Sequence, residues 1–437
     1  MIREVLATQD LRQDSSTYGL FPYYANYGLD RMTLNDYNWA VFNGNSLVEL
    51  LELGAVPPGE LREAMEVSIL AAAECIRRRD VVPSYTNIAI HSLPVLVHAG
   101  KRVGAYLDNA RTKLAALRRQ LAIDGGLREY LSSTYYGIDL EGLINLLLVA
   151  DDPQILADAR AILDLVFHDI ASHYHHETAQ MTGPHARCYC LDMGQGVTQL
   201  GAFLHFVLKD GHPAFRNPGG KPRFNLPPLF LLRTFATMPS PLIPAWFVEQ
   251  INRPDPLPRY LVRGSDQGDT VLHTRFLPPL SVGWINHQDN WEQRNNLLAY
   301  WPLGDGRTGH CSEKLLRDSE TFAEPYPWVS ARFQCREAGL ATYRVSYGFT
   351  ENGGDRHFVD RDEPNRFSRV LVRFSLRDPA LGATALSEGS WEFTRPGLSV
   401  RIEALTLTGI AGFPPRLRAQ RTMDGWTVEA VSYTHLA

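Results

Sequence analysis

The residues best able to do chemistry in this 437-residue chain lie in the segment GPHARCYCLDMG at 183–194. The Gly-Pro pair at its start disfavours a helix. If the following residues are extended, His185, Arg187 and Tyr189 project from one side of the chain and smaller residues from the other. A base, a cation and a phenol facing one way would suit an anionic substrate. The alternative is a plain strand or loop with alternating polarity.

A second segment, SYTNIAIHSL at 84–93, carries polar groups at helical spacing. Asn87 and His91 lie four residues apart and would share one face of a helix. An amide beside an imidazole can hold a carboxylate or assist a proton transfer. The alternative is that both are ordinary polar residues with their hydrogen bonds satisfied at a helix end.

A third segment, EYLSSTYYGIDLEGL at 129–143, places Tyr135 and Tyr136 where a loop meets the start of a helix. The positive end of the helix dipole there favours a phenolate over a phenol. Either tyrosine could therefore act as an acid or a base. Paired tyrosines are also common packing residues with one hydrated end, which is the alternative interpretation.

The segment HDIASHYHHE at 168–177 is rich in histidine. Asp169, His173 and either His176 or Glu177 could lie on one helical face and bind a metal ion. Histidines in the last turn of a helix also suit the negative end of its dipole. We favour that second interpretation, because no H-E-x-x-H motif is present.

Composition narrows the class of protein. The chain has 48 acidic and 43 basic residues, a formal net charge of −5. No Lys/Arg stripe stands out that could neutralise phosphates, which argues against a nucleic-acid partner. No stretch of about 18 apolar residues suggests a membrane span. The opening MIREVLATQDLRQDSS is charged where a signal peptide needs an apolar run, so we expect a cytoplasmic protein, or a secreted or periplasmic one whose leader was removed.

Five cysteines are too few and too scattered for a disulfide scaffold. Cys188 and Cys190 have no second pair at metal-ligand spacing, so we expect them in the core.

Residues from about 35 to 250 show helical periodicity. Between 60 and 79, apolar residues recur every three or four positions and form one amphipathic stripe. Short connections between successive helices predict antiparallel neighbours, either in a ring of helical hairpins or in an open stack. The expected helices lie near 44–54, 60–79, 84–99, 102–122, 138–149, 153–174 and 194–209.

From Tyr260 onward the pattern changes to short runs of β-branched and aromatic residues, which is typical of an antiparallel sandwich. Helices first and strands afterwards predict an α+β chain of two packed domains. We place these domains at 1–255 and 256–430. The last residues, 431–437, end in VSYTHLA and read as translated cloning sequence, so we expect them to be non-native.

In the β half, the motifs LHTRF and WINHQDNW bring together His273, Arg275 and Trp284. Aromatic ring faces beside polar side chains with forked ends, such as arginine, are typical of sugar-binding surfaces. The same residue types also build ordinary sandwich edges.

A helical half followed by a β-sandwich, with these motifs, resembles the polysaccharide lyases built on an incomplete (α/α) toroid and an antiparallel β domain. They include alginate lyases and heparinase-like uronate lyases. The segments SSTYYGIDLEGL and GPHARCYCLDMG look like the S-P-T-Y-Y-G and G-P-H-S-R-x-Y patterns of the heparinase-like members.

The resemblance implies β-elimination on a uronic-acid-containing polysaccharide. The C5 proton of the uronate is removed and the 4-O-linked sugar is expelled. Asn87, His91 and Arg187 would neutralise the carboxylate. His185 or Tyr136 would take the proton, and Tyr189 or Tyr136 would protonate the leaving oxygen. The substrate contacts would come from Tyr135, Trp284, His273 and Arg275.

The resemblance requires no redox cofactor, and a structural metal stays open. Its partner is an anionic polysaccharide. Two other classes remain. A glycoside hydrolase on a similar helical barrel would need two carboxylates roughly 5–10 Å apart. A non-catalytic glycan-binding protein would use the aromatic β surface. The hydrolase candidates are Asp139, Glu141, Asp192 and Asp289.

Overall fold

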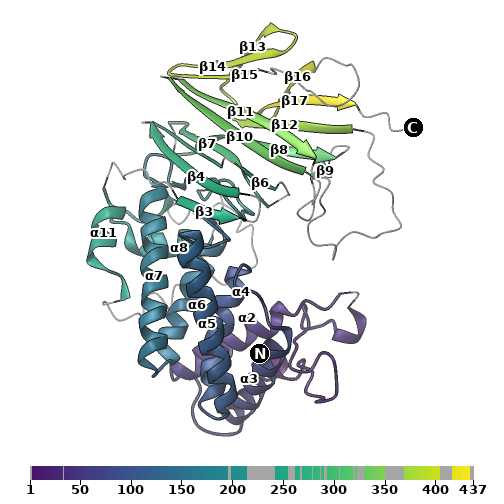
Figure 1. Cartoon of the computed structure of the whole chain (residues 1–437), viewed down its shortest axis with the longest axis vertical. Coiled ribbons are helices and arrows are strands. Elements are labelled where there is room, and N and C mark those ends of the chain that lie inside the picture. Colours follow the sequence, from purple (N-terminus) through teal and green to yellow (C-terminus); the bar gives the residue numbers. More distant parts are fainter. Residues whose placement is uncertain are drawn as a thin grey trace.

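The computed structural model contains a helical region followed by an antiparallel β region (Figure 1). The structure describes residues 2–32, 34–194, 198–213, 242–253, 261–265, 268–277, 279–285, 287–289, 293–304, 306–317, 320–321, 329–338, 340–349, 369–403 and 416–433. This arrangement confirms the predicted α+β class. Within the described part of the chain, no helix combines the length and hydrophobicity needed to cross a bilayer.

The helical region is built from long helices joined by short connections. Their bounds are α1 Ile2–Leu6, η1 Leu29–Arg31, α2 Asn38–Glu52, α3 Glu60–Arg79, α4 Thr86–Gly100, α5 Gly104–Asp124, α6 Tyr135–Val149, α7 Pro153–His173, α8 Gln199–Val207 and α11 Ala245–Ile251. The expected helices are all present, with ends shifted by a few residues.

The long helices form two layers. In the inner layer, α4 packs against α2 and α6, and α6 packs against α8. In the outer layer, α5 packs between α3 and α7. Every residue of α4 is buried, whereas α5 buries only one stripe of side chains. Alternating inner and outer helices form an arc of hairpins, as in an incomplete (α/α) toroid.

Local signals fix several helix ends. Asp152 caps α7 by accepting hydrogen bonds from the backbone N–H groups of Gln154 and Ile155. The last turn of α3 carries Arg77, Arg78 and Arg79 at the negative end of its dipole.

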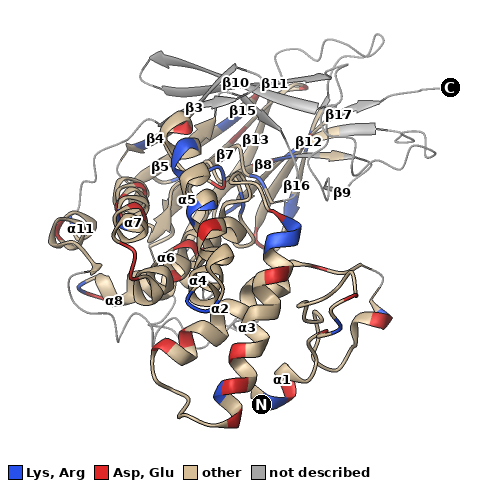
Figure 2. Ribbon diagram, turned by 60° about the horizontal axis from the view of Figure 1, so that its bottom comes forward, with Lys and Arg blue, Asp and Glu red and all other residues tan. Residues whose placement is uncertain are grey.

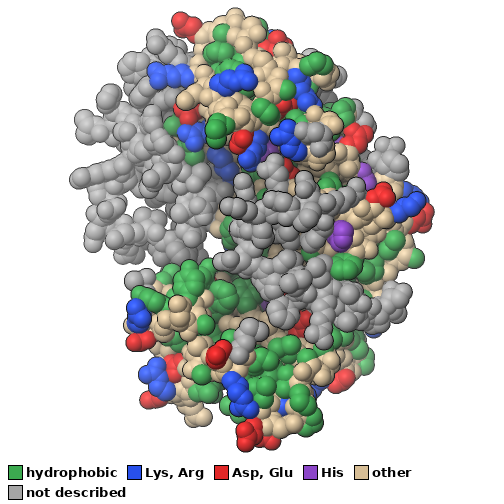
Figure 3. All heavy atoms as spheres, turned by 180° about the vertical axis from the view of Figure 1, so that it is seen from behind, with side chains coloured by type: hydrophobic (Ala, Val, Ile, Leu, Met, Phe, Trp, Pro, Cys, Tyr) green, Lys and Arg blue, Asp and Glu red, His purple; other side chains and the backbone are tan. Residues whose placement is uncertain are grey.

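Along the helices, acidic and basic residues are interspersed (Figure 2), and the same holds for the face of the molecule in Figure 3.

The strands follow most of the predicted runs. Their bounds are β1 Tyr174–His175, β2 Gln180–Met181, β3 Leu261–Ser265, β4 Gly268–Leu277, β5 Leu280–Ile285, β6 His287–Asp289, β7 Leu297–Pro302, β8 Thr308–Arg317, β9 Glu320–Thr321, β10 Val329–Ala338, β11 Leu340–Phe349, β12 Arg369–Arg377, β13 Gly382–Ser387, β14 Ser390–Arg395, β15 Leu398–Glu403, β16 Arg416–Thr422 and β17 Gly425–Tyr433. β17 includes residues 431–433, the first three of the tail expected to be non-native.

The largest sheet is antiparallel, in the order β16-β17-β12-β8-β7-β5-β4-β3, with β9 added to β8. A three-stranded sheet, β13-β14-β15, lies at the end farthest from the helices (Figure 1). A second hydrophobic cluster joins the two sheets, with Trp301 and Leu376 against Phe393 and Ile402. The β region is therefore a sandwich at this end.

One continuous core joins the helices to the large sheet. Leu272, Val282, Trp284 and Ile285 of β4 and β5 belong to the same cluster as the buried residues of α4, α6 and α7. The last described helix ends at Ile251 and β3 begins at Leu261, on either side of the boundary predicted at 255/256. The segment between α7 and α8 lies at this junction and carries the motif with the most chemistry.

Candidate active site

The chain from 178 to 192 is held against the large sheet by polar contacts at close range. Thr274 Oγ1 donates to the carbonyl of Gly183 at 2.9 Å, and Tyr300 OH donates to the carbonyl of Leu191 at 2.5 Å. A Cβ on Gly283 would fall 1.7 Å from the Gly183 oxygen, so only glycine permits this approach. The sheet therefore fixes the backbone from which Arg187 and Tyr189 extend.

The same segment pairs with the chain that precedes β7. His185 and Asn295 form an isolated antiparallel bridge, and the backbone N–H of Cys188 donates to the carbonyl of Gln293 at 2.7 Å. Arg187 lies between His185 and Cys188 in this segment, and its side chain extends toward the helices. The position of Arg187 therefore depends on both the helical region and the β region, and local sequence cannot specify it.

Arg187 is the centre of a polar cluster. Its Nη1 donates to Glu129 Oε1 at 2.6 Å and its Nε to Gln293 Oε1 at 2.6 Å. Its Nη2 donates to the hydroxyls of Tyr135 at 3.0 Å and Tyr189 at 3.1 Å. The guanidinium carbon also lies 4.6 Å from the centre of the Tyr135 ring. One cation thus holds two phenols in a fixed geometry.

The two phenols touch each other at the edge of the cluster. Their oxygens are 3.0 Å apart, and either one could donate. The Tyr189 residue is 41% exposed, and the Arg187 side chain is 14% exposed. The cation and the outer phenol therefore remain accessible from solvent and are not sealed in the core.

Burial keeps Tyr135 protonated. It raises the pKa of Tyr135 well above its usual range, and this effect exceeds the lowering by Arg187. The expectation that the helix start favours a phenolate is therefore wrong for Tyr135, because desolvation dominates. A protonated Tyr135 can donate to Tyr189, whose oxygen then accepts from Tyr135 and Arg187 together.

Glu129 fixes the cation from behind. Its second oxygen accepts from the backbone N–H of Asn87 at 2.8 Å and from Asn87 Nδ2 at 2.6 Å. Burial acts to lower the pKa of Arg187, but Glu129 and the two phenols raise it above its ordinary value. Arg187 therefore stays charged at any working pH.

Asn87 does not face a substrate. It is almost fully buried, and its side chain amide contacts Glu129. The prediction that it touches the carboxylate is therefore corrected, because the first turn of α4 points the amide at the ion pair. Asn87 acts on the cluster through Glu129.

His91 lies deeper in the same helix. Its Nε2 is 2.7 Å from the carbonyl of Ile138, and its Nδ1 is 3.3 Å from Asn45 Nδ2. Burial lowers its pKa to about 4. The imidazole is neutral at pH 7, buried between α2 and α6, and cannot neutralise a substrate carboxylate as we had predicted.

His185 and Tyr136 are also fully buried. The Nδ1 of His185 contacts the carbonyl of Leu131, and burial lowers the pKa of this histidine to about 4. Tyr136 OH donates to Asp169 Oδ2 at 2.7 Å. The predicted exposure of His185 beside Arg187 is wrong, because the bridge to Asn295 turns the imidazole toward the interior.

The predicted substrate contacts in the β region differ in their exposure to solvent. Trp284 is 6% exposed and belongs to the main core, so it offers no face to a sugar. His273 stacks on that ring at 4.8 Å between centres, and both His273 and Arg275 remain partly exposed. The side chains of 286–292, which include Asp289, lie outside the described residues.

The histidine-rich segment does not form one helical face. α7 ends at His173, and Tyr174–His175 form β1, so His176 and Glu177 lie beyond the helix. His173 Nδ1 is 2.7 Å from the carbonyl of Asp169, and His176 Nε2 contacts the carbonyl of Ile251. Among the described residues, no group of three metal-ligating side chains converges.

The carboxylates proposed for hydrolysis are largely withdrawn from solvent. Asp139 is fully buried, and burial raises its pKa well above the ordinary value. Burial also raises the pKa of Glu141 to about 8. Asp192 is nearly buried and accepts from Gln180 Nε2 at 2.8 Å.

Sequence reasoning missed four members of the cluster: Glu129, Tyr85, Asn38 and Gln293. Arg187 lies 5.9 Å from the centre of the Tyr85 ring, and Tyr85 OH accepts from Asn38 Nδ2 at 2.9 Å. Glu129 and Tyr85 stand at the first or second position of segments already selected, so their residue types were a usable signal. Gln293 had none, since it reaches the site only through the sheet.

The comparison with known families is limited to the N-terminal half. Residues 1–218 match a family model described as a domain of unknown function, DUF8769. The match includes α2 to α8 and the segment with Arg187 and Tyr189, and it stops before the segment that contains Gln293. No curated protein matches the chain.

Proposed function

We propose that this protein is a polysaccharide lyase that cleaves a uronic-acid-containing chain by β-elimination, with Tyr189 as its acid–base group. One observation carries the proposal: an accessible phenol accepts a hydrogen bond from a charged arginine and can accept another from a phenol kept protonated by burial. A phenol oxygen held by such donors can take a proton from a substrate and return it.

Tyr189 takes up and returns the same proton in the proposed reaction. The Tyr189 phenolate takes the C5 proton, and the C5–H electron pair moves toward the carboxylate. The C4–O4 bond then breaks with formation of the C4–C5 double bond, and Tyr189 returns the proton to the leaving oxygen. Arg187 supplies positive potential to the carboxylate as its charge grows. Tyr135 donates to Tyr189 throughout the cycle.

The remaining members of the cluster position these groups. Glu129 and Gln293 fix the guanidinium, and Asn87 fixes Glu129. A hydrolase is the weaker alternative, because Asp139 and Asp192 are buried and hydrolysis needs two carboxylates at the scissile bond.

The test is a substrate screen with two readouts. Purified protein is mixed with alginate, glucuronan, pectate, hyaluronan and heparin-type chains. Elimination creates a conjugated double bond that absorbs in the ultraviolet, together with new reducing ends. Reducing ends without that absorbance would indicate hydrolysis, and binding without either product would indicate a non-catalytic protein. Both results would overturn the proposal.

A further inference from the structure

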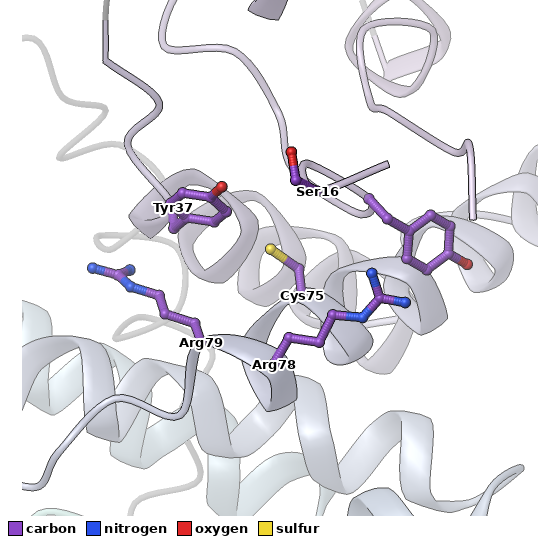
Figure 4. Close-up of a pocket in the computed structure, with 6 residues that line it drawn as sticks. Ser16, Tyr37, Cys75, Arg78 and Arg79 are labelled. Carbon is purple, nitrogen blue, oxygen red and sulfur yellow. The ribbon is translucent and has the colours of Figure 1, made fainter. Parts of the chain in front are cut away.

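A separate pocket of about 240 Å³ opens beside the C-terminal end of α3. Its lining is Ser16, Tyr18, Tyr37, Cys75, Arg78 and Arg79. Figure 4 shows Arg78 and Arg79 on either side of Cys75, with Ser16 and Tyr37 above them. No carboxylate lines it. A space of this size lined by two arginines and three residues with hydroxyl groups is suited to a small oxyanion carried on a sugar.

The two arginines of the pocket differ in their partners. Arg78 is paired with Glu74 at 2.8 Å, and this carboxylate also pairs with Arg77. The half-buried Arg79 donates from Nη1 to the amide oxygen of Asn38 at 2.6 Å, and no carboxylate pairs with it among the described residues. A half-buried guanidinium bonded to a neutral group keeps its full charge for a ligand.

Tyr85 connects this pocket to the proposed active site. Arg79 lies 6.0 Å from the centre of the Tyr85 ring, and Arg187 lies 5.9 Å from the same centre. The two guanidinium carbons are therefore no more than about 12 Å apart, since both are within cation–π range of one ring. A short oligosaccharide can span that distance.

We propose that this pocket is an anion subsite in which Arg79 binds the carboxylate or sulfate of a second sugar unit on the polysaccharide whose reacting unit lies at Arg187. The inference rests on the proposed function for the reaction at Arg187. Binding of an anionic sugar unit in the pocket does not depend on that reaction. It makes the substrate a chain with anionic groups on more than one unit. Arg78 acts mainly through its field, because Glu74 already occupies its Nε.

The experiment measures binding and turnover separately. A uronate tetrasaccharide from the polymer cleaved fastest, or from alginate if none is cleaved, is titrated calorimetrically into wild type, Arg79→Gln and Arg77→Gln. Arg77 is the matched control, since it lies on the same helix but outside the pocket. Sodium sulfate is titrated separately as a free anion. Ser16→Trp, at an exposed position, fills the pocket and keeps both arginines.

We expect Arg79→Gln and Ser16→Trp to weaken tetrasaccharide binding about 10- to 100-fold, as loss of a charge-assisted contact does. Arg77→Gln should change it less than about threefold. In kinetics, the rise in KM for Arg79→Gln should exceed any fall in kcat. Unaltered tetrasaccharide binding by either pocket variant would overturn the subsite. Weaker sulfate binding by Arg79→Gln, with tetrasaccharide binding unchanged, would overturn it as well.

The two proposals can fail independently. Elimination activity with Arg79-insensitive binding would remove the subsite and leave the lyase. Arg79-sensitive binding of the tetrasaccharide without elimination would support the subsite and remove the lyase.

Discussion

Two segments selected from the sequence for their polar residues, α4 and 183–192, use those residues in opposite ways. α4 is an inner helix, so Asn87 and His91 are buried and contact other parts of the protein. The segment 183–192 lies between the helices and the sheet, so it buries His185 but leaves Tyr189 accessible. The difference teaches that these polar residues on the inner helix position or stabilise other protein groups. The accessible polar side chain lies at the junction of the helical and β regions.

The largest expected effect is on the accessible side of this comparison. Replacing Tyr189 with Phe removes the proposed acid–base hydroxyl and should lower kcat about 10²- to 10⁴-fold with little change in folding. Tyr27→Phe is the matched control, because Tyr27 is 39% exposed and lies 4.2 Å from Arg31. Steady-state rates on the cleaved polymer measure both. Equal turnover of Tyr189→Phe and wild type would place the chemistry elsewhere.

The ion pair beneath the phenols should dominate stability. Glu129→Gln leaves the charged and largely buried Arg187 without its counter-ion, which should lower the free energy of unfolding by about 3 kcal/mol. Glu74→Gln, which breaks pairs with the exposed Arg77 and Arg78, should lower it by only about 1 kcal/mol or less. Urea unfolding at pH 7 measures both. Similar losses in the two variants would show that the junction is not the more tightly coupled region.

The buried histidine of the junction should make stability depend on pH. Burial lowers the pKa of His185 to about 4, against about 6.5 in the unfolded chain. Its contribution is therefore complete above pH 6.5 and is lost as pH falls from 6.5 toward 4, by about 3 kcal/mol. Urea unfolding from pH 7 to 4 should show a shallower loss for His185→Gln than for wild type. His168→Gln, at an exposed position, is the control, and equal slopes in all three proteins would contradict the assignment.

The smallest expected effect sharpens the role of the inner helix. Asn87→Ala removes one of the two Asn87 donors to Glu129 and keeps the backbone N–H. The loss in unfolding free energy should be about 1 kcal/mol. If Asn87 only positions Glu129, kcat should fall less than tenfold and its pH profile should keep its shape. A fall as large as that of Tyr189→Phe would return Asn87 to direct contact with the substrate.

By itself, the sequence determined the class and order of the elements. The period of the apolar residues changes near Tyr260, and helices and strands differ in that period, so both regions and most element positions followed from it. Polar strands were among those the sequence did not single out, such as β8, whose run TGHCSEKLLR lies in the sheet because its backbone pairs with β7 and β12 on either side. It also selected the segments containing Arg187, Tyr189 and Tyr135, because those residue types are suited to binding anions and moving protons.

Only the tertiary structure decided which of those groups reach solvent. His185 and Tyr189 are four residues apart, yet one is sealed by the bridge to Asn295 and the other stands at the surface. The partners of Arg187 come from the connection between α5 and α6, from the start of α6 and from the chain before β7, which are brought together by packing between the helices and the sheet. Burial and long-range contacts set the charge and access of each group, and neither quantity is a property of local residue order.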